Sequence, residues 1–320
     1  DLRRRIVRAI GDPESRFRED HLRMLRAVRF AATLDFALEE GTAAAIRSHA
    51  PAILRISAER VQQELSRLLT EAPHAGQGLV LLDHVGLLEQ ILPEIAALKG
   101  VEQPPEFHPE GDVFRHTVAM LDLMQEPAAE LAYAVLLHDV GKPPTFRVGT
   151  DREGRPRIRF DNHAAVGAEM AEAILRRLRM SNAFIDRVVT AVRQHMRFIE
   201  VRNMRDATLR RMLAAPTLPL ELELHRLDCL SSHGELGNYA FLQERLAAMS
   251  REVRLPEPWV SGRDLMQLGL PEGPRVGQWR RRAYDAQLNG QFASREELLA
   301  WLGSELAREK PSPPDGAAAT

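Results

Sequence analysis

Apolar residues recur at three- and four-residue spacing along most of the chain, which is the period of an amphipathic α-helix. Leu22, Leu25 and Val28 show the pattern clearly, and it predicts a helix over residues 17–34. The alternation that is typical of strands is scarce. Only residues 147–163, which contain a glycine-bearing turn, predict a short β-hairpin. The pattern as a whole therefore predicts an all-α, multi-helical protein.

Three proline-containing or polar stretches interrupt the helical pattern. They lie at residues 101–112, 214–222 and 254–262. We therefore predict three helical parts, a neck and body over residues 1–100, a middle domain over residues 110–250 and a small tail over residues 258–303. Residues 304–320 are poor in core-forming side chains and predict disorder.

Composition limits the class of protein. Of the 320 residues, 44% are hydrophobic and 28% are charged, which is ordinary for a globular protein. The formal net charge of −2 excludes a uniformly basic nucleic-acid-binding protein, although arginine-rich stretches can form local patches. No apolar run approaches the length of a bilayer span, so we expect no membrane segment. Cys229, the only cysteine, cannot form an internal disulfide, which suits a cytoplasmic protein.

One apolar segment ends in a chemically unusual way. Residues 131–137 are all apolar, and they run directly into His138 and Asp139. Adjacent side chains on a regular helix point about 100° apart, so both can reach one ion only where the helix ends. Gly141 and Pro143 indicate such an end. We therefore predict that the helix stops at this pair and that the pair binds a metal.

Further imidazoles and a carboxylate follow in order through the middle part, each near the end of an apolar segment. They are His116, His163, His195 and Asp228. Together with the His-Asp pair they suit a borderline or hard divalent cation, and ligands from different helices would hold a bundle together. A single histidine on an apolar face is more often a hydrogen-bonded core residue. The prediction therefore depends on the ordered set and not on any one member.

This order of His, His-Asp-x-Gly-Lys, His, His and Asp resembles the HD superfamily of metal-dependent phosphohydrolases. The resemblance implies His116, His138, Asp139 and Asp228 as ligands of a first ion, and His163 and His195 as ligands of a second, with Asp139 bridging. It implies one or two divalent ions, among which Mg, Mn, Ni and Co are not distinguished. It also implies hydrolysis of phosphoesters such as 2′,3′-cyclic nucleotides at His138 and Asp139. Lys142 either pairs with the substrate phosphate or is a solvated lysine.

The first part carries a longer pattern. Residues 11–36 read GDPESRFREDHLRMLRAVRFAATLDF, and residues 56–65 read ISAERVQQEL. Physically this is an amphipathic helix on which Glu19 and Arg23 are spaced for an i,i+4 ion pair. The amino-acid sequence of these two stretches closely resembles the neck of bacterial tRNA nucleotidyltransferases, the CCA-adding enzymes, and of poly(A) polymerases.

That resemblance implies a nucleotide-binding role for three neck residues. Asp20 and Arg23 would hydrogen-bond the base edge of CTP or ATP, and Arg26 would lie near the triphosphate. A three-residue spacing places Asp20 and Arg23 on one side of a helix, and their acceptor and donor groups match a base edge. Glu59 and Arg60 are expected to brace the neck.

The tail also resembles these enzymes, in the members that carry an HD domain. Arg280, Arg281 and Arg282 either grip the backbone of tRNA or another RNA 3′ end, or form a solvated basic face. In this family a polymerising domain precedes the neck, with a glycine-rich loop and an Asp-x-Asp pair that holds Mg²⁺. The sequence contains neither element, so we interpret the chain as a fragment without that domain.

Three functions are consistent with these features. The leading interpretation is a tRNA-binding and CTP- or ATP-binding fragment of a CCA-adding enzyme or poly(A) polymerase, with a phosphoester-hydrolysing HD domain. The alternatives are a stand-alone HD phosphohydrolase and a non-catalytic RNA-binding scaffold with a structural metal. CCA addition and A-only tailing share this neck, and the sequence does not separate them.

Overall fold

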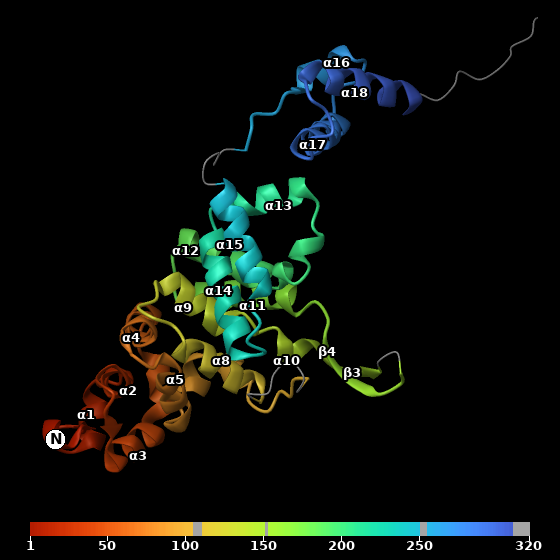
Figure 1. Cartoon of the computed structure of the whole chain (residues 1–320). Helices are drawn as coiled ribbons and strands as arrows, with labels where there is room; N and C mark the ends of the chain where they lie inside the picture. The colour runs from red at the N-terminus through yellow and green to blue at the C-terminus, as the bar shows by residue number, and fades with distance from the viewer. Residues whose placement is uncertain (105–110, 151–152, 250–254, 310–320) are drawn as a thin grey trace, which may run out of the picture. The chain divides into compact units, whose positions relative to one another are not determined.

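A computed structural model describes residues 1–104, 111–150, 153–249 and 255–309. The chain divides into two compact units (Figure 1). Unit 1 comprises Asp1–Ile199 and Pro219–Leu242, and unit 2 comprises Glu200–Leu218 and Gln243–Thr320. Helices dominate both units, and the strands that the structure describes are short, so the all-α prediction is confirmed.

Unit 1 begins with a group of packed helices. They are η1 (Leu2–Arg4), α1 (Pro13–Glu19), α2 (Leu22–Leu34), α3 (Glu40–His49), η2 (Ala50–Arg55), α4 (Ala58–Glu71), α5 (Ala75–His84), α6 (Leu87–Ile91) and α7 (Pro93–Ala96). Two short strands, β1 (Ile6–Val7) and β2 (Ala37–Leu38), pair in parallel. Helix α2 packs on α4 and α5 through fully buried side chains such as Met24, Leu25 and Val28.

The single helix predicted over residues 17–34 is wrong. The helix breaks between α1 and α2, where Asp20 adopts an extended conformation with φ −151° and ψ 105°. Its carboxylate Oδ1 accepts a hydrogen bond from the backbone N–H of Leu22, 3.1 Å away. Aspartate competes with helical hydrogen bonding in this way, which is why it favours helix ends over helix interiors.

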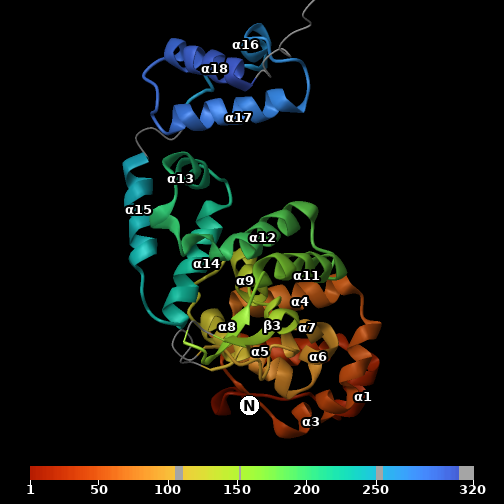
Figure 2. The ribbon, with the colours of Figure 1, turned by 90° about the vertical axis from the view of Figure 1, so that its right-hand side faces the viewer.

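In the rest of unit 1, the other elements surround helix α9 (Ala129–Leu137), which is very apolar (Figure 2). These other elements are α8 (Val113–Asp122), α10 (Lys142–Thr145), β3 (Phe146–Thr150), β4 (Pro156–Phe160), α11 (His163–Arg177), α12 (Asn182–Gln194), η3 (His195–Phe198) and most of α14 (Leu218–Ser231), followed by the start of α15 (Gly237–Met249). Residues 132–137 of α9 are all fully buried, as expected of a helix that is apolar on every side. Strands β3 and β4 form the predicted hairpin, which is confirmed.

Unit 1 joins the first predicted part to most of the second. Helix α5 packs on α8, and α4 packs on α9, so one apolar core runs through both. The boundaries of the predicted domains stay a prediction. The predicted break over residues 101–112 lies partly outside the described residues.

Unit 2 has its own small core. Its elements are η4 (Val201–Asn203), α13 (Asp206–Leu213), α16 (Gly262–Gln267), α17 (Pro274–Leu288) and α18 (Arg295–Glu309). Trp279 of α17 is buried there beside Leu298 and Leu302 of α18. Residues 304–309, predicted to be disordered, continue α18 because Leu306 extends its buried face. Residues 310–320 lie outside the described residues.

Among the described residues, no helix combines the length and the apolarity that crossing a bilayer requires.

Candidate metal centre and nucleotide-binding neck

The His-Asp pair lies at a helix end, as predicted. Helix α9 stops at Leu137, His138 follows at its C-terminal cap, and α10 begins at Lys142. Gly141 in this turn packs tightly against α11: a Cβ there would lie 2.2 Å from the carbonyl oxygen of His163 and 2.5 Å from the backbone nitrogen of Gly167. The turn can therefore approach α11 closely only because residue 141 has no side chain.

All six predicted ligands come together in two adjoining groups. The first group is His116, His138 and Asp228, and the second is Asp139, His163 and His195. Within each group the potential ligand atoms lie within 4.8 Å of one another. Asp139 connects the groups, because its Oδ2 lies 3.0 Å from Nε2 of His138 and its Oδ1 lies 3.6 Å from Nε2 of His163. The set draws on α8, α11, η3 and α14 as well as the end of α9.

Backbone carbonyls fix the tautomers of three of the imidazoles. Nδ1 of His138, His163 and His195 lies 2.8, 2.8 and 2.6 Å from the carbonyl oxygens of Val135, Phe160 and Val192, respectively. A carbonyl only accepts, so each Nδ1–H donates, and the neutral ring keeps its lone pair on Nε2.

These lone pairs point at one another. Nε2 of His163 lies 3.2 Å from Nε2 of His195, and Nε2 of His138 faces the carboxylate of Asp139. Two acceptors held this close in a buried place repel each other unless a cation lies between them. The arrangement therefore fits a divalent metal, whose imidazole ligands are commonly oriented by a hydrogen bond from the other ring nitrogen.

The charge states agree with that conclusion. Burial lowers the pKa of His195 to about 4, only partly opposed by Asp139, and burial likewise lowers the pKa of His163. Burial acts to raise the pKa of Asp139, but its interactions with His138 and with the ammonium group of Lys142 outweigh burial and hold that pKa well below its usual range. Neutral imidazole and ionised carboxylate are the forms that bind metals.

Lys142 is buried at the edge of this ligand set rather than solvated. Its Nζ lies 2.6 Å from Oδ2 of Asp139 and donates to Oε1 of Gln103 at 2.6 Å. Gln103 is itself only 6% exposed. Sequence reasoning missed this glutamine because it lies in a proline-containing stretch that reads as a linker.

The neck residues form a network around the break between α1 and α2. Oδ2 of Asp20 lies 3.1 Å from Nη2 of Arg60 on α4. Arg23 pairs with Glu19, as its spacing predicted, and also donates to the carbonyl oxygen of Arg16. Because Asp20 lies outside both helices, the prediction that it shares a helix face with Arg23 is wrong.

Arg26 is joined to α4 by a carboxylate that the sequence analysis did not single out. Its Nε donates to Oε1 of Glu64 at 2.9 Å, while Oε2 of Glu64 accepts from the buried Arg29 at 2.6 Å. The signal was available: Glu64 follows Val61 by three residues on the buried face of its helix, and a buried acid requires a cationic partner.

Comparison with known proteins places the HD ligand set and the neck in one family of enzymes. An HD domain matches residues 113–232, and a domain described as the probable RNA and SrmB-binding site of polymerase A matches residues 35–99. The chain is 37% identical over 327 residues to an A-adding tRNA nucleotidyltransferase of Deinococcus radiodurans, covering 97% of this chain and 73% of that protein. The chain belongs to the tRNA nucleotidyltransferase family. The family prediction is thus confirmed, and the HD domain implies divalent metal binding.

Other members of the tRNA nucleotidyltransferase family agree. A CC-adding tRNA nucleotidyltransferase of Thermus thermophilus is 38% identical over 330 residues, covering 98% of this chain and 73% of the relative. The CCA-adding enzyme of Bacillus stearothermophilus, solved in complex with CTP, superimposes with a TM-score of 0.65 at 27% identity, over 97% of this chain and 68% of that enzyme. The relatives are thus named for different nucleotide additions.

The predicted RNA-contacting arginines differ in what they contact. Arg282 pairs with Glu305, and its guanidinium lies 4.6 Å from the ring centre of Trp279 and 5.1 Å from that of Trp301. It therefore holds α17 to α18. Arg280 and Arg281 are exposed on α17.

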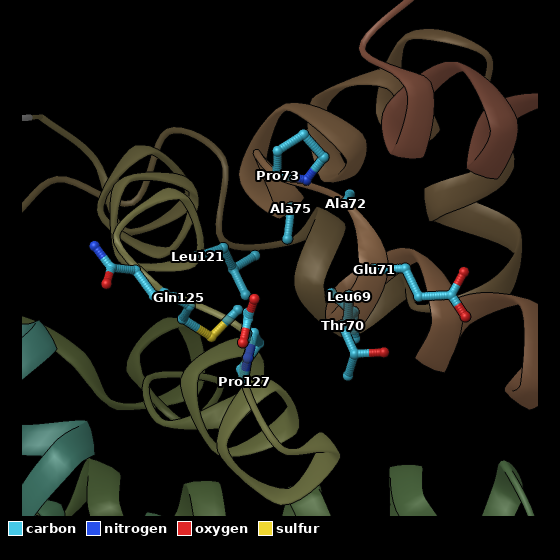
Figure 3. A pocket seen from close by; sticks show the side chains of 11 residues that line it. Leu69, Thr70, Glu71, Ala72, Pro73, Ala75, Leu121, Gln125 and Pro127 are labelled. Carbon is cyan, nitrogen blue, oxygen red and sulfur yellow. The ribbon is translucent and has the colours of Figure 1, made fainter.

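A pocket of about 290 Å³ lies elsewhere in unit 1, between the α4–α5 turn and the α8–α9 connection (Figure 3). Its lining is mostly apolar, with Leu69 and Leu121 on opposite sides and Glu71 at the edge. None of the predicted site residues lines it, so it is separate from the candidate ligand set.

Proposed function

We propose that this chain reads the base of CTP or ATP at the α1–α2 break, binds tRNA along its body and tail, and hydrolyses phosphoesters at the HD centre. The observation that carries the first two roles is the identity to tRNA nucleotidyltransferases over almost the whole chain, with a CTP-bound CCA-adding enzyme among the similar structures. The observation that supports the third is the buried set of six ligands that share Asp139.

In the base-reading role, Asp20 accepts a hydrogen bond from the amino group of the base and Arg23 donates to a ring or carbonyl acceptor. Arg60 holds the carboxylate of Asp20 from α4, which fixes its direction before the nucleotide arrives. Arg26 keeps a half-exposed guanidinium, although Glu64 accepts from its Nε. It therefore still has donors to offer to a triphosphate.

Asp20→Ala is expected to weaken the binding of CTP and ATP by roughly tenfold, the loss of one hydrogen bond to a charged group. Equilibrium titration of each nucleotide measures it. Asp20→Asn keeps an oxygen for the N–H of Leu22 and separates base reading from helix capping. Asp35→Asn, at an exposed ion pair with Arg5, is the control. Unchanged affinity in Asp20→Ala would refute the base-reading role.

In the hydrolytic role, the ligand groups would hold one or two divalent ions, which lower the pKa of bound water and polarise a phosphoryl oxygen. Four of the six ligands are imidazoles, which favours a transition-metal ion such as Mn, Co or Ni over Mg. Lys142, held between Asp139 and Gln103, offers its ammonium group to the phosphoryl oxygens. In such a hydrolysis a water oxygen would bond to phosphorus and give up a proton, the ester P–O bond would break, and the leaving oxygen would take up a proton.

The double variant Arg280→Ala, Arg281→Ala is expected to weaken tRNA binding. The slope of log Kd against log salt concentration should also fall by about 2, since each phosphate contact contributes about 0.9 to that slope. Filter binding over a range of salt concentrations measures it. Arg282→Ala should instead lower the unfolding temperature of unit 2, because it removes the contacts with Glu305 and two tryptophans. If both variants weakened tRNA binding equally and neither changed the unfolding temperature, the assignment of RNA contact to Arg280 and Arg281 and of a structural role to Arg282 would be contradicted.

A further inference from the structure

The hairpin β3–β4 has two chemically different faces. Its strands pair antiparallel with Phe146 opposite Phe160, Arg147 opposite Arg159 and Val148 opposite Ile158. Successive side chains of a strand point to opposite faces. One face of the hairpin therefore carries the two phenylalanines, Val148 and Ile158, and the other face carries only arginines and a glycine.

The arginine face is crowded with positive charge. Arg147 and Arg159 stand directly opposite each other, and Arg157 is opposite Gly149. Like charges at opposed positions of an antiparallel pair destabilise it. In the part of the chain that the structure describes, no ion pair joins Arg147, Arg157 or Arg159 to an acid. Arg159 donates only to the backbone oxygen of Thr150, at 3.1 Å. Among the described residues, this face therefore has no acidic partner that would offset its charge.

The hairpin is attached directly to the metal centre. Strand β3 follows α10, and β4 leads into α11, so the base of the hairpin lies between Lys142 and His163. The ring centre of Phe160 lies 5.3 Å from Nζ of Lys142 and 6.4 Å from the ring centre of His163. From this base the hairpin extends away from the helices of unit 1 (Figure 1).

The apolar face of the hairpin is partly exposed to solvent, although the hairpin begins next to the polar HD ligand set. Phe146 is 40% exposed and Val148 is 63% exposed, although the ring of Phe146 packs edge-on against Phe160. The hairpin therefore offers an exposed aromatic ring on one face and basic side chains on the other. Proteins bind single-stranded nucleic acids with aromatic rings and basic side chains together, because bases stack on the rings and phosphates pair with the charges.

We propose that the hairpin β3–β4 binds single-stranded RNA and leads its terminal phosphoester to the HD ligand set. Arg147, Arg157 and Arg159 hold the phosphates, and Phe146 supports a base near the terminus. The catalytic part of this inference rests on the proposed phosphoester hydrolysis, whereas RNA binding by the hairpin does not. A mononucleotide reaches the ligand set without the arginines, so the hairpin selects for longer substrates.

The triple variant Arg147→Ser, Arg157→Ser, Arg159→Ser tests the proposal in the full chain. The probes are a short oligouridylate that ends in a 2′,3′-cyclic phosphate and a 2′,3′-cyclic mononucleotide. We expect kcat/KM for the oligonucleotide to fall by roughly tenfold relative to kcat/KM for the mononucleotide, the loss of at least one contact to a charged group. Fluorescence anisotropy with the same oligouridylate measures Kd over a range of salt concentrations. The slope of log Kd against log salt concentration should fall by about 2, since each phosphate contact to a single strand contributes about 0.7 to that slope.

A charge-matched control removes three exposed arginines of unit 1 that each pair with a nearby acid, Arg67→Ser, Arg176→Ser and Arg187→Ser. Arg147→Glu is a second variant that does not weaken the fold, because it places a carboxylate opposite Arg159 and so favours strand pairing. It should still weaken oligonucleotide binding.

The outcomes separate the two ideas. If the unmodified chain hydrolyses neither substrate with divalent metal present, the proposed hydrolysis fails, and the anisotropy result alone decides whether the hairpin binds RNA. If the triple variant and the control bind and process the oligonucleotide equally well, the hairpin inference is overturned, whatever the hydrolytic activity. Loss of binding in both triple variants would also overturn it, because net charge rather than the hairpin would then be responsible.

Discussion

Asp139→Ala is expected to lower the hydrolysis of a 2′,3′-cyclic nucleotide by about 10³-fold or more and to reduce bound metal in both ligand groups. The carboxylate reaches both groups, with His138 at 3.0 Å, His163 at 3.6 Å and His195 at 3.8 Å. Its loss removes a ligand charge and leaves Lys142 buried without its carboxylate partner. Metal ions contribute several kcal/mol to such reactions, and about 4 kcal/mol corresponds to 10³-fold.

The comparison that makes this result specific is Asp186→Asn, a change to an exposed carboxylate on α12. Both proteins are loaded with Mn²⁺, their metal content is measured by elemental analysis, and their kcat/KM is compared. The control should match the unmodified chain in both measurements. An Asp139→Ala protein that keeps its full metal content and activity would show that the six side chains do not act on one centre. The proposed hydrolysis would then have no site.

The candidate ligands that the structure brings together were predictable from their order along the chain, and not from any one residue. His138 and Asp139 end an apolar run before a glycine and a proline, and the structure ends α9 there. The amphipathic spacing likewise predicted helices, since tertiary packing here follows the hydrophobic pattern. The hydrophobic pattern thus predicted the helical fold, although it did not show the break at Asp20 between α1 and α2.

The failures involve polar residues whose contacts the hydrophobic pattern does not show, and some of their partners are far away in the chain. Asp20 breaks the predicted helix by binding Leu22 and is held by Arg60, forty positions away. Gln103 gains its role from Lys142 at a separation of 39 residues. The sequence cannot reveal such pairs, because each polar residue reads alone as a surface or linker position. Their burial becomes visible only when the helices are packed.

Gly141→Ala is expected to destabilise unit 1 by about 3 kcal/mol and to reduce the metal content. The backbone of Gly141 has φ −82° and ψ −6°, which any residue adopts, so conformational strain is not the reason. The added methyl group would instead meet the carbonyl oxygen of His163 at 2.2 Å and the nitrogen of Gly167 at 2.5 Å. Backbone atoms cannot rotate away, and overpacking of this kind costs about 1–3 kcal/mol or more.

Two other glycines calibrate this effect. Gly167→Ala approaches the same contact from the opposite side, with its methyl group 3.2 Å from the nitrogen of Gly141, so it should cost less. Gly277→Ala, in helix α17 with no atom nearby, should be neutral or stabilise unit 2 by about 1 kcal/mol. Denaturant unfolding followed by circular dichroism gives the free energies of unfolding of the three variants.

The Gly141→Ala variant should also lose metal. Because its methyl group pushes α10 away from α11, His163 must move away from Asp139, and metal content should fall together with stability. A Gly141→Ala protein that is as stable as the unmodified chain and binds as much metal would contradict the close packing on which the ligand geometry depends.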